Sequence, residues 1–222
     1  MFSSYAGLRQ RKVIRNILFV CLADGLVGVS YGAVSVSSGL DLWVPVSLSI
    51  LVLAGSSEFL FIGIVSSGGS MFSAALAGLL VNARHVPFGL SVRDLIGRGP
   101  LALLGCHVMN DESVVFGMSQ PSAGERKLSY WLCGLGILGL WPLGVFLGGT
   151  LGSLIQDTAS LGLDAMFPAI ILALVLPHFK SASDIITAGV GAGIAVVSVP
   201  WVPVGVPALL SLAGTCIGRK RR

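Results

Sequence analysis

Seven ionisable residues lie inside long apolar runs of this sequence, where a charge is costly to keep. They are Asp24, Glu58, Arg84, His85, His107, Asp111 and Glu112. An ionised side chain within a membrane helix costs at least about 2.5–3.5 kcal/mol on insertion scales. These residues must therefore pair with one another or face a cavity. They are the candidates for chemistry, and two kinds are open to them: proton transfer and recognition of a polar ligand.

Glu58 stands out because small residues, Ala54 to Ser57, precede it and would let backbone or a ligand approach. A buried carboxyl of this kind can load and release a proton. Two interpretations remain open, a substrate or proton site and a structural ion pair with Arg84. His107 and Asp111 are four residues apart and would share one face of a continuous helix. They are either a proton relay or part of a charged helix end at the membrane interface.

Asp24 lies among Gly25, Gly28 and Gly32. Such a glycine-rich stretch can break a helix and expose backbone donors, which bind amino-acid carboxylates in transporters. The alternative is an unbroken helix whose glycines make a close helix contact, with Asp24 capping or pairing locally. The sequence leaves both open.

An enzyme is the competing class. Hydroxyls and imidazoles for an intramembrane serine hydrolase are offered by Ser56, Ser57, Ser66 and Ser67 with His85 and His107. No G-x-S-G arrangement, H-E-x-x-H helix or Gly-rich phosphate loop accompanies them. The four cysteines are scattered singly and are interpreted as small buried hydrophobes. We therefore expect no enzyme, no catalytic residue, no cofactor and no metal.

Composition shows which elements must position these residues. Only 11% of the 222 residues are charged and 54% are hydrophobic, with a mean hydropathy of +0.90. Soluble domains carry about 25% charged residues, so this chain must be solvated by lipid. We predict an all-α, polytopic membrane helical bundle forming a single domain, 1–222, with six to eight transmembrane helices, some of them short or broken. The predicted spans are residues 16–37, 42–65, 71–90, 100–118, 128–155, 161–176, 185–199 and 202–218.

Basic residues gather in two tails, 1–15 and 219–222, which is typical of cytoplasmic segments and not of a nucleic-acid-binding face. With both termini cytoplasmic the number of crossings is even. In the eight-span arrangement Arg93 and Arg98 fall on the opposite side, and a re-entrant first or fourth segment would change this. Residues 39–45 are echoed at 162–168, which suggests an internal repeat.

Four motifs in order resemble the AzlC family, the large subunits of bacterial branched-chain amino acid exporters. They are Ala54-Gly55-Ser56-Ser57-Glu58-Phe59, Asn82-Ala83-Arg84-His85, Asn110-Asp111-Glu112 and the run from Gly162 to Ala169. The resemblance implies a multi-pass inner-membrane exporter of valine, leucine and isoleucine, sometimes methionine, driven by the proton gradient. It also implies a small AzlD-type membrane subunit as partner.

On this basis the expected substrate- and proton-binding residues are Glu58, Asp24, Asn82, Arg84, His85, Asp111, Glu112 and Gly55. The chain departs from the family at two of these motifs. Glu58 stands where the family usually has glutamine, and Asn110 where threonine is more frequent. The competing hypothesis outside transport is a structural or regulatory membrane subunit whose glycine rows and charges dock a partner.

Overall fold

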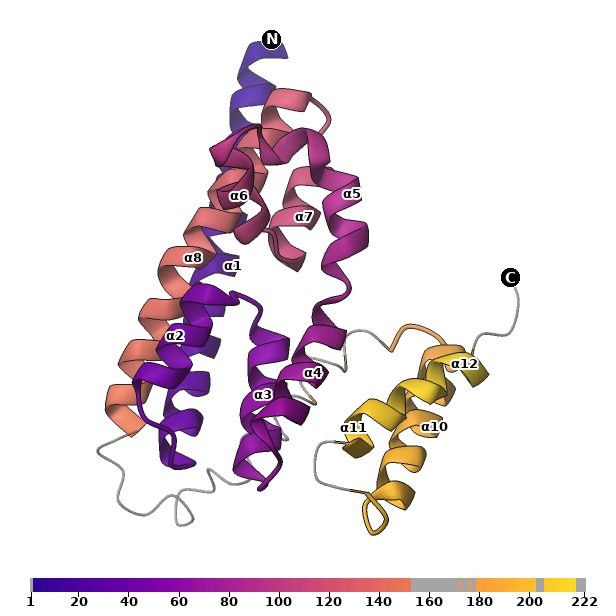
Figure 1. Cartoon of the computed structure of the whole chain (residues 1–222). Helices are drawn as coiled ribbons and strands as arrows, with labels where there is room; N and C mark the ends of the chain where they lie inside the picture. Colours follow the sequence, from indigo (N-terminus) through magenta and orange to yellow (C-terminus); the bar gives the residue numbers. More distant parts are fainter. Residues whose placement is uncertain (1, 153–171, 173–175, 177–178, 203–205, 219–222) are drawn as a thin grey trace. The chain divides into compact units, whose positions relative to one another are not determined.

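The computed structural model describes residues 2–152, 172, 176, 179–202 and 206–218, and the regular structure within them is helical throughout (Figure 1). The chain divides into two compact units. Unit 1 comprises Met1–Gly55 and Ala83–Gln156, and unit 2 comprises Ser56–Asn82 and Asp157–Arg222. The helices of unit 1 are α1 (Phe2–Ser37), α2 (Trp43–Leu51), α5 (His85–Ile96), α6 (Pro100–His107), α7 (Asp111–Met118) and α8 (Ala123–Gly152).

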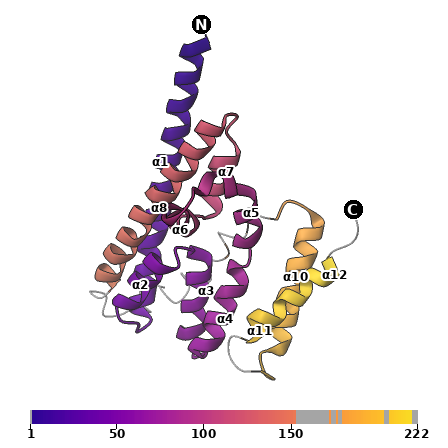
Figure 2. The same cartoon turned by 45° about the horizontal axis from the view of Figure 1, so that its top comes forward.

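The long helices α1 and α8 form the frame of unit 1 and lie side by side in Figures 1 and 2. A Cβ added at Gly28 would lie 2.8 Å from the carbonyl oxygen of Trp141, and one at Gly152 would lie 2.8 Å from that of Ala33. Glycine is required because the two backbones touch. The contact positions rise together along both helices, so α1 and α8 run in the same direction. Gly25, Gly28 and Gly32 thus serve helix packing, so of the two alternatives left open at Asp24 the unbroken helix is observed and the helix break is not.

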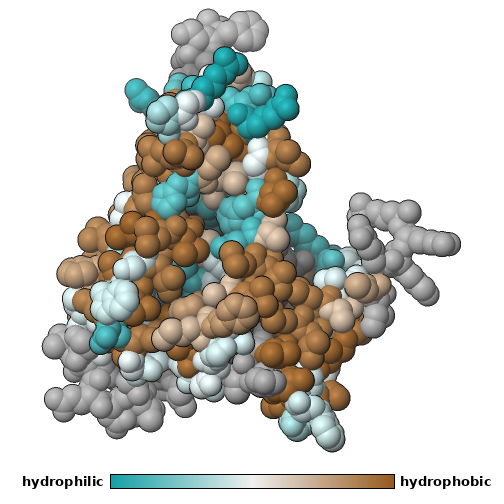
Figure 3. Space-filling view, viewed as in Figure 1, coloured by the Kyte–Doolittle hydropathy of each residue, from teal (hydrophilic) through white to brown (hydrophobic). Residues whose placement is uncertain are grey.

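The flanks of this helix pair are apolar and open to the surroundings. Leu18, Phe19 and Leu26 of α1 are 53%, 61% and 71% exposed. In Figure 3 hydrophobic residues cover much of the visible flank, while hydrophilic residues gather at the end where α1 and α8 begin. Among the described residues two helices, Gln10–Ser37 and Ala123–Gly152, are long and apolar enough to cross a membrane. A third span results if α4 (Met71–Asn82) and α5 form one broken span.

Three of the predicted spans are interrupted near their centres, each at a sequence motif. Residues 42–65 form α2 and α3 (Gly55–Ser66), separated at 52–54, where Leu53 adopts a φ of 51°. Residues 71–90 change from α4 to α5 at 83–84, and residues 100–118 change from α6 to α7 at 108–110. Each interruption starts a new helix whose first backbone N–H groups need other partners.

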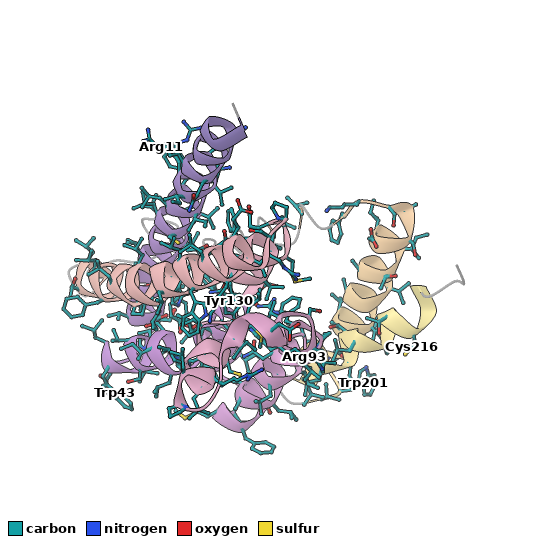
Figure 4. All side chains as sticks on the ribbon, turned by 90° about the horizontal axis from the view of Figure 1, so that it is seen from above. Arg11, Trp43, Arg93, Tyr130, Trp201 and Cys216 are labelled. Atoms are coloured by element: carbon teal, nitrogen blue, oxygen red, sulfur yellow. The ribbon has the colours of Figure 1, made fainter. Side chains whose placement is uncertain are left out.

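Helices α6 and α7 form a hairpin connected at residues 108–110, so residues 100–118 are two short helices and not one continuous span. The Tyr130 hydroxyl of α8 donates to the Gly105 carbonyl of α6 at 2.7 Å. The connection after α6 lies further along α8, at Gly134, where an added Cβ would lie 2.6 Å from the Val108 carbonyl oxygen. Along α7 the contacts with α8 return, because Gly117 is again packed against Tyr130. Figure 4 shows Tyr130 between α8 and this group of helices.

Two basic residues lie elsewhere than the eight-span arrangement places them. Trp131, near the start of α8, donates its indole N–H to the Leu95 carbonyl at 2.9 Å, so the end of α5 lies beside the start of α8. Arg93 and Arg98 lie two residues before and three residues after Leu95, and so lie near the first turns of α8. The hairpin corresponds to the re-entrant fourth segment that the sequence left open, and not to the eight-span arrangement that put these two residues on the opposite side.

Unit 2 contains α3, α4, α10 (Ala182–Ser198), α11 (Val206–Leu210), the 3-10 helix η2 (Ser211–Ala213) and α12 (Gly214–Gly218). Helices α3 and α4 pack through Ile64, Ala74 and Ala77. A Cβ at Gly191 of α10 would lie 2.6 Å from the Ser211 carbonyl oxygen, so the short C-terminal helices rest on α10. The predicted span 202–218 is thus divided into short helices. Most of the predicted span 161–176 and the second copy of the repeat, 162–168, lie outside the described residues.

Candidate functional site

Charged and polar side chains of unit 1 meet where α5 and α7 begin. Asp24 is at the centre of the 28-residue apolar stretch Gln10–Ser37 of α1. Arg84 is the residue before α5, and Asn110 is the residue before α7. Together with Asp111 and Glu112, the first two residues of α7, these five residues form what we call the mid-depth cluster.

An ion pair links the two helix starts of the cluster. Nη2 of Arg84 lies 3.0 Å from Oδ2 of Asp111, and the two side chains are 32% and 43% exposed. Arg84 therefore has an acidic neighbour in this unit, and the pair brings the N-terminal ends of α5 and α7 together. Each such end carries a partial positive charge of roughly half a unit. The guanidinium and the two helix ends make this side of the cluster rich in donors.

The acceptor side of the cluster is formed by Asp24 and Glu112. The two carboxyl groups are close enough for a direct electrostatic interaction, and Glu112 also interacts with the Arg84 guanidinium. Oδ2 of Asp24 is buried, and it accepts no hydrogen bond from the part of the chain that the structure describes. A buried acceptor without a hydrogen bond costs free energy. Protonation of the Asp24 carboxyl group or a donor from a bound ligand would remove this cost.

Asn110 was not among the predicted site residues, although it stands directly before two of them. Its Oδ1 accepts a hydrogen bond from the Ser113 backbone N–H at 2.8 Å, and its own N–H donates to Oγ of Ser113 at 3.0 Å, which completes a capping box. The residue is only 6% exposed, yet its Nδ2 finds no acceptor among the described residues. An unmatched buried donor costs about 1–3 kcal/mol. The sequence named Asn110 only as part of the Asn110-Asp111-Glu112 motif, and the unmatched amide is what makes it a site candidate.

Two thiols lie next to the cluster. Sγ of Cys21 contacts the carbonyl oxygen of Cys133 at 3.6 Å, and both residues are buried in the contact between α1 and α8. They behave as the small buried residues that the sequence predicted. Cys106 and Cys216 are exposed, and for them that prediction is wrong. Within the residues described, no three His, Cys, Asp or Glu side chains are grouped so that they could hold a metal ion.

The other predicted site residues lie at the remaining helix breaks. Glu58 is in the first turn of α3 within unit 2 and is only 1% exposed, and half-buried Asn82 ends α4 in the same unit. Gly55 belongs to unit 1, where a Cβ would lie 3.0 Å from the ring of Trp141. His85 begins α5 and contacts Phe88 edge to face at 6.0 Å. The structure thus joins Asp24, Arg84, Asp111 and Glu112 in one cluster.

The proton relay of His107 and Asp111 and the intramembrane serine hydrolase both lose support. His107 ends α6 and Asp111 begins α7, so the continuous helix that would place them on one face does not exist. Ser66 and Ser67 donate to the carbonyls of Ile62 and Gly63, each at 2.7 Å. Their hydroxyls are used by their own helix, as is usual for serine in membrane helices. The cluster instead offers donors and acceptors at one place, which is the complement of a small zwitterion.

Comparisons with known proteins agree with a membrane transport role. The model of a family described as "AzlC protein" matches residues 20–155. An "Uncharacterized membrane protein" of Helicobacter pylori is 27% identical over 82% of this chain and 81% of its own length. The "Branched-chain amino acid transport protein AzlC" of Bacillus subtilis is 26% identical over 78% and 68%, and "Inner membrane protein YgaZ" of Escherichia coli is 25% identical over 86% and 80%. No solved structure matches.

Proposed function

The chain belongs to the AzlC family, and on that premise we propose that it exports branched-chain amino acids in exchange for protons. The proposed substrates are valine, leucine and isoleucine, with methionine as a further candidate. The chain acts as the large subunit of a two-component exporter, together with a small AzlD-type membrane subunit. It resides in the bacterial inner membrane.

The observation that carries the proposal is the mid-depth cluster. An amino acid has one carboxylate and one ammonium group, so its site needs donors and acceptors a few ångströms apart. The donors are the Arg84 guanidinium and the starts of α5 and α7, and the acceptors are the carboxyl groups of Asp24 and Glu112. Broken helices that point their N-terminal ends at a substrate carboxylate are a recurring device of transporters.

The orientation follows from the basic residues. Arg11, Lys12 and Arg15 of α1 share one end of unit 1 with Arg126 and Lys127, because residues 10–14 of α1 line one groove with residues 125–132 of α8. Arg93 and Arg98 lie near the same end, because Leu95 between them accepts a hydrogen bond from Trp131 of α8. Positively charged segments mark the cytoplasmic side of inner-membrane proteins. We therefore place this end, and the start of α1, in the cytoplasm.

Glu58, which belongs to unit 2, is proposed to bind either the coupled proton or the ammonium group of the substrate. Its side chain is almost fully buried in the first turn of α3, where an ionised carboxylate is favoured by the helix dipole and disfavoured by burial. Glutamine has nearly the same shape and cannot ionise. If Glu58 carries the proton, Glu58→Gln should keep valine binding and change the pH dependence of transport. An unchanged pH dependence removes Glu58 from coupling.

The function is tested by transport in vesicles that contain the chain with its small partner subunit. A proton gradient should drive accumulation of radiolabelled valine, and excess leucine or isoleucine should compete. An uncoupler should abolish accumulation. The proposal fails if valine moves no faster than in vesicles without the protein, or if a panel of other amino acids competes and the branched ones do not.

The structural-subunit alternative finds less support in the fold. It relied on the glycine rows as docking faces, but Gly25, Gly28 and Gly32 are occupied by the contact with α8. Gly144, Gly148 and Gly152 form the other side of the same contact. These rows are therefore not free to bind a second protein.

A further inference from the structure

Asn110 carries a hydrogen-bonding group that its structural role does not use. Its Oδ1 caps α7 by accepting from Ser113, while Nδ2 is buried without an acceptor among the described residues. Capping a helix requires only a side-chain oxygen, which serine, threonine or aspartate supplies equally well. The amide nitrogen at this position is therefore unexplained by the fold of α7.

The orientation of this amide is fixed by its neighbours. The backbone N–H of Ser113 donates to Oδ1 at 2.8 Å. If the amide were flipped, its NH₂ group would face this N–H, and two donors would then repel each other. The Ser113 hydroxyl is also engaged, because it donates toward the carbonyls of Val108 and Asn110 at 3.2 and 3.1 Å. Nδ2 thus has to point its two N–H bonds away from the capping box.

The surroundings of the amide indicate what it binds. Asn110 is joined directly to Asp111, whose carboxylate already pairs with Arg84 at 3.0 Å, and it stands at the start of α7. A positive helix end, a guanidinium and an amide donor at one place favour an anionic acceptor. We infer that Nδ2 of Asn110 donates a hydrogen bond to the carboxylate of the transported amino acid. This inference rests on the proposed function and assigns the α7 start as the carboxylate subsite.

The test uses two substitutions that keep the cap and remove the amide donor. Asn110→Asp retains the size and the capping oxygen, and Asn110→Ser retains a capping hydroxyl without adding charge. Binding is measured with the full chain in nanodiscs, together with its small partner subunit, by displacement of radiolabelled valine. Valinol serves as the second ligand because it keeps the ammonium and the branched side chain but lacks the carboxylate.

We expect both variants to bind valine at least tenfold more weakly than the unmodified chain, since a hydrogen bond to a charged group is lost. Valinol affinity should change less than threefold, so the preference for valine over valinol collapses. The thermal unfolding midpoint should stay within a few degrees, as the cap remains. Asn16→Asp makes the same chemical change at an exposed position of α1 and should alter neither ligand's affinity.

Three outcomes overturn the inference. Unchanged valine binding in both variants means that the amide is satisfied by water only. An equal loss of valine and valinol, with a lowered unfolding midpoint, means that Asn110 serves the fold alone. If the unmodified chain binds no branched-chain amino acid, the proposed function fails and the subsite fails with it, which is a result distinct from the first two.

Discussion

The hairpin of α6 and α7 makes a prediction about membrane topology that can be tested with single cysteines. The loops on either side of the hairpin, at Arg98 and at Ser122, are both exposed. If α6 and α7 together crossed the bilayer, these two positions would lie on opposite sides. Because the hairpin returns to the end from which it started, we expect both on the side of Lys12, and Asp41 on the other.

The depth that the hairpin can reach in the bilayer follows from the lengths of its two helices. Helix α6 has 8 residues, which at 1.5 Å per residue is about 12 Å, less than half of a hydrocarbon layer of about 30 Å. Helix α7 also has 8 residues and retraces the same distance. Neither helix alone spans the layer, and their contacts with α8 advance to Gly134 and return to Tyr130. A crossing would need those contacts to continue toward the far end of α8.

The assay starts from a chain whose four native cysteines are replaced by alanine. Single cysteines at Lys12, Arg98, Ser122 and Asp41 are then labelled with a membrane-impermeant maleimide, in intact cells and in inverted vesicles. We expect three positions to label in one preparation and Asp41 in the other. Labelling of Ser122 together with Asp41, and apart from Arg98, would refute the hairpin and restore residues 100–118 as a span.

Three further substitutions probe the packing around the site. Gly28→Ala should lower the free energy of unfolding by about 1–3 kcal/mol, because the added methyl would lie 2.8 Å from the Trp141 carbonyl oxygen; thermal unfolding in nanodiscs measures it. A double-mutant cycle of Arg84→Gln and Asp111→Asn should give a coupling of about 0.5–1 kcal/mol, discounted because both side chains are about a third or more exposed. Tyr130→Phe should cost about 1 kcal/mol, since the buried Gly105 carbonyl loses its donor.

The chain supplies matched controls for the first two. Gly139→Ala lies in α8 with no atom within 4 Å of the added methyl, so it should leave stability unchanged or raise it slightly. The pair Arg93 and Asp94 is 3.7 Å apart with side chains 79% and 90% exposed, so its cycle should show no measurable coupling. Equal effects at Gly28 and Gly139, or equal coupling in both pairs, would contradict the packing described here.

The sequence predicted the membrane class and the long helices well, because these depend on composition and length. Residues 16–37 and 128–155 were predicted as spans, and α1 and α8 include most of each. A close helix contact was one of the two interpretations of Gly25, Gly28 and Gly32, and the structure confirms it. Local spacing suffices for such features because each depends on one helix face.

The sequence allowed for broken helices and a re-entrant fourth segment, but it could not locate the breaks or decide between a crossing and a hairpin. Residues 100–118 are apolar enough to be taken for a span, and nothing in their periodicity distinguishes one crossing from a descent and a return. The turn is fixed by distant residues, chiefly Tyr130 and Gly134 of α8. Likewise the charged candidates were identified because burial is costly, but pairing Arg84 with Asp111 required knowing that α5 and α7 begin at the same place.

The charges of the mid-depth cluster suggest how substrate and proton are coupled. Arg84 and two helix ends supply roughly two positive charges, against three carboxylates if Asp24, Asp111 and Glu112 are all ionised. Asp111 is paired with Arg84, so the donor side keeps about one positive charge for the substrate carboxylate. The side formed by Asp24 and Glu112 lacks a cation, which either a proton or the ammonium of the amino acid can provide. On the proposed function we therefore expect valine binding to release about one proton, measured by titration calorimetry in buffers of different ionisation enthalpy. Asp24→Asn should remove this release, because it supplies a neutral side chain of the same size. Proton release that persists in that variant would show that the exchange occurs elsewhere, with Glu58 as the next group to replace.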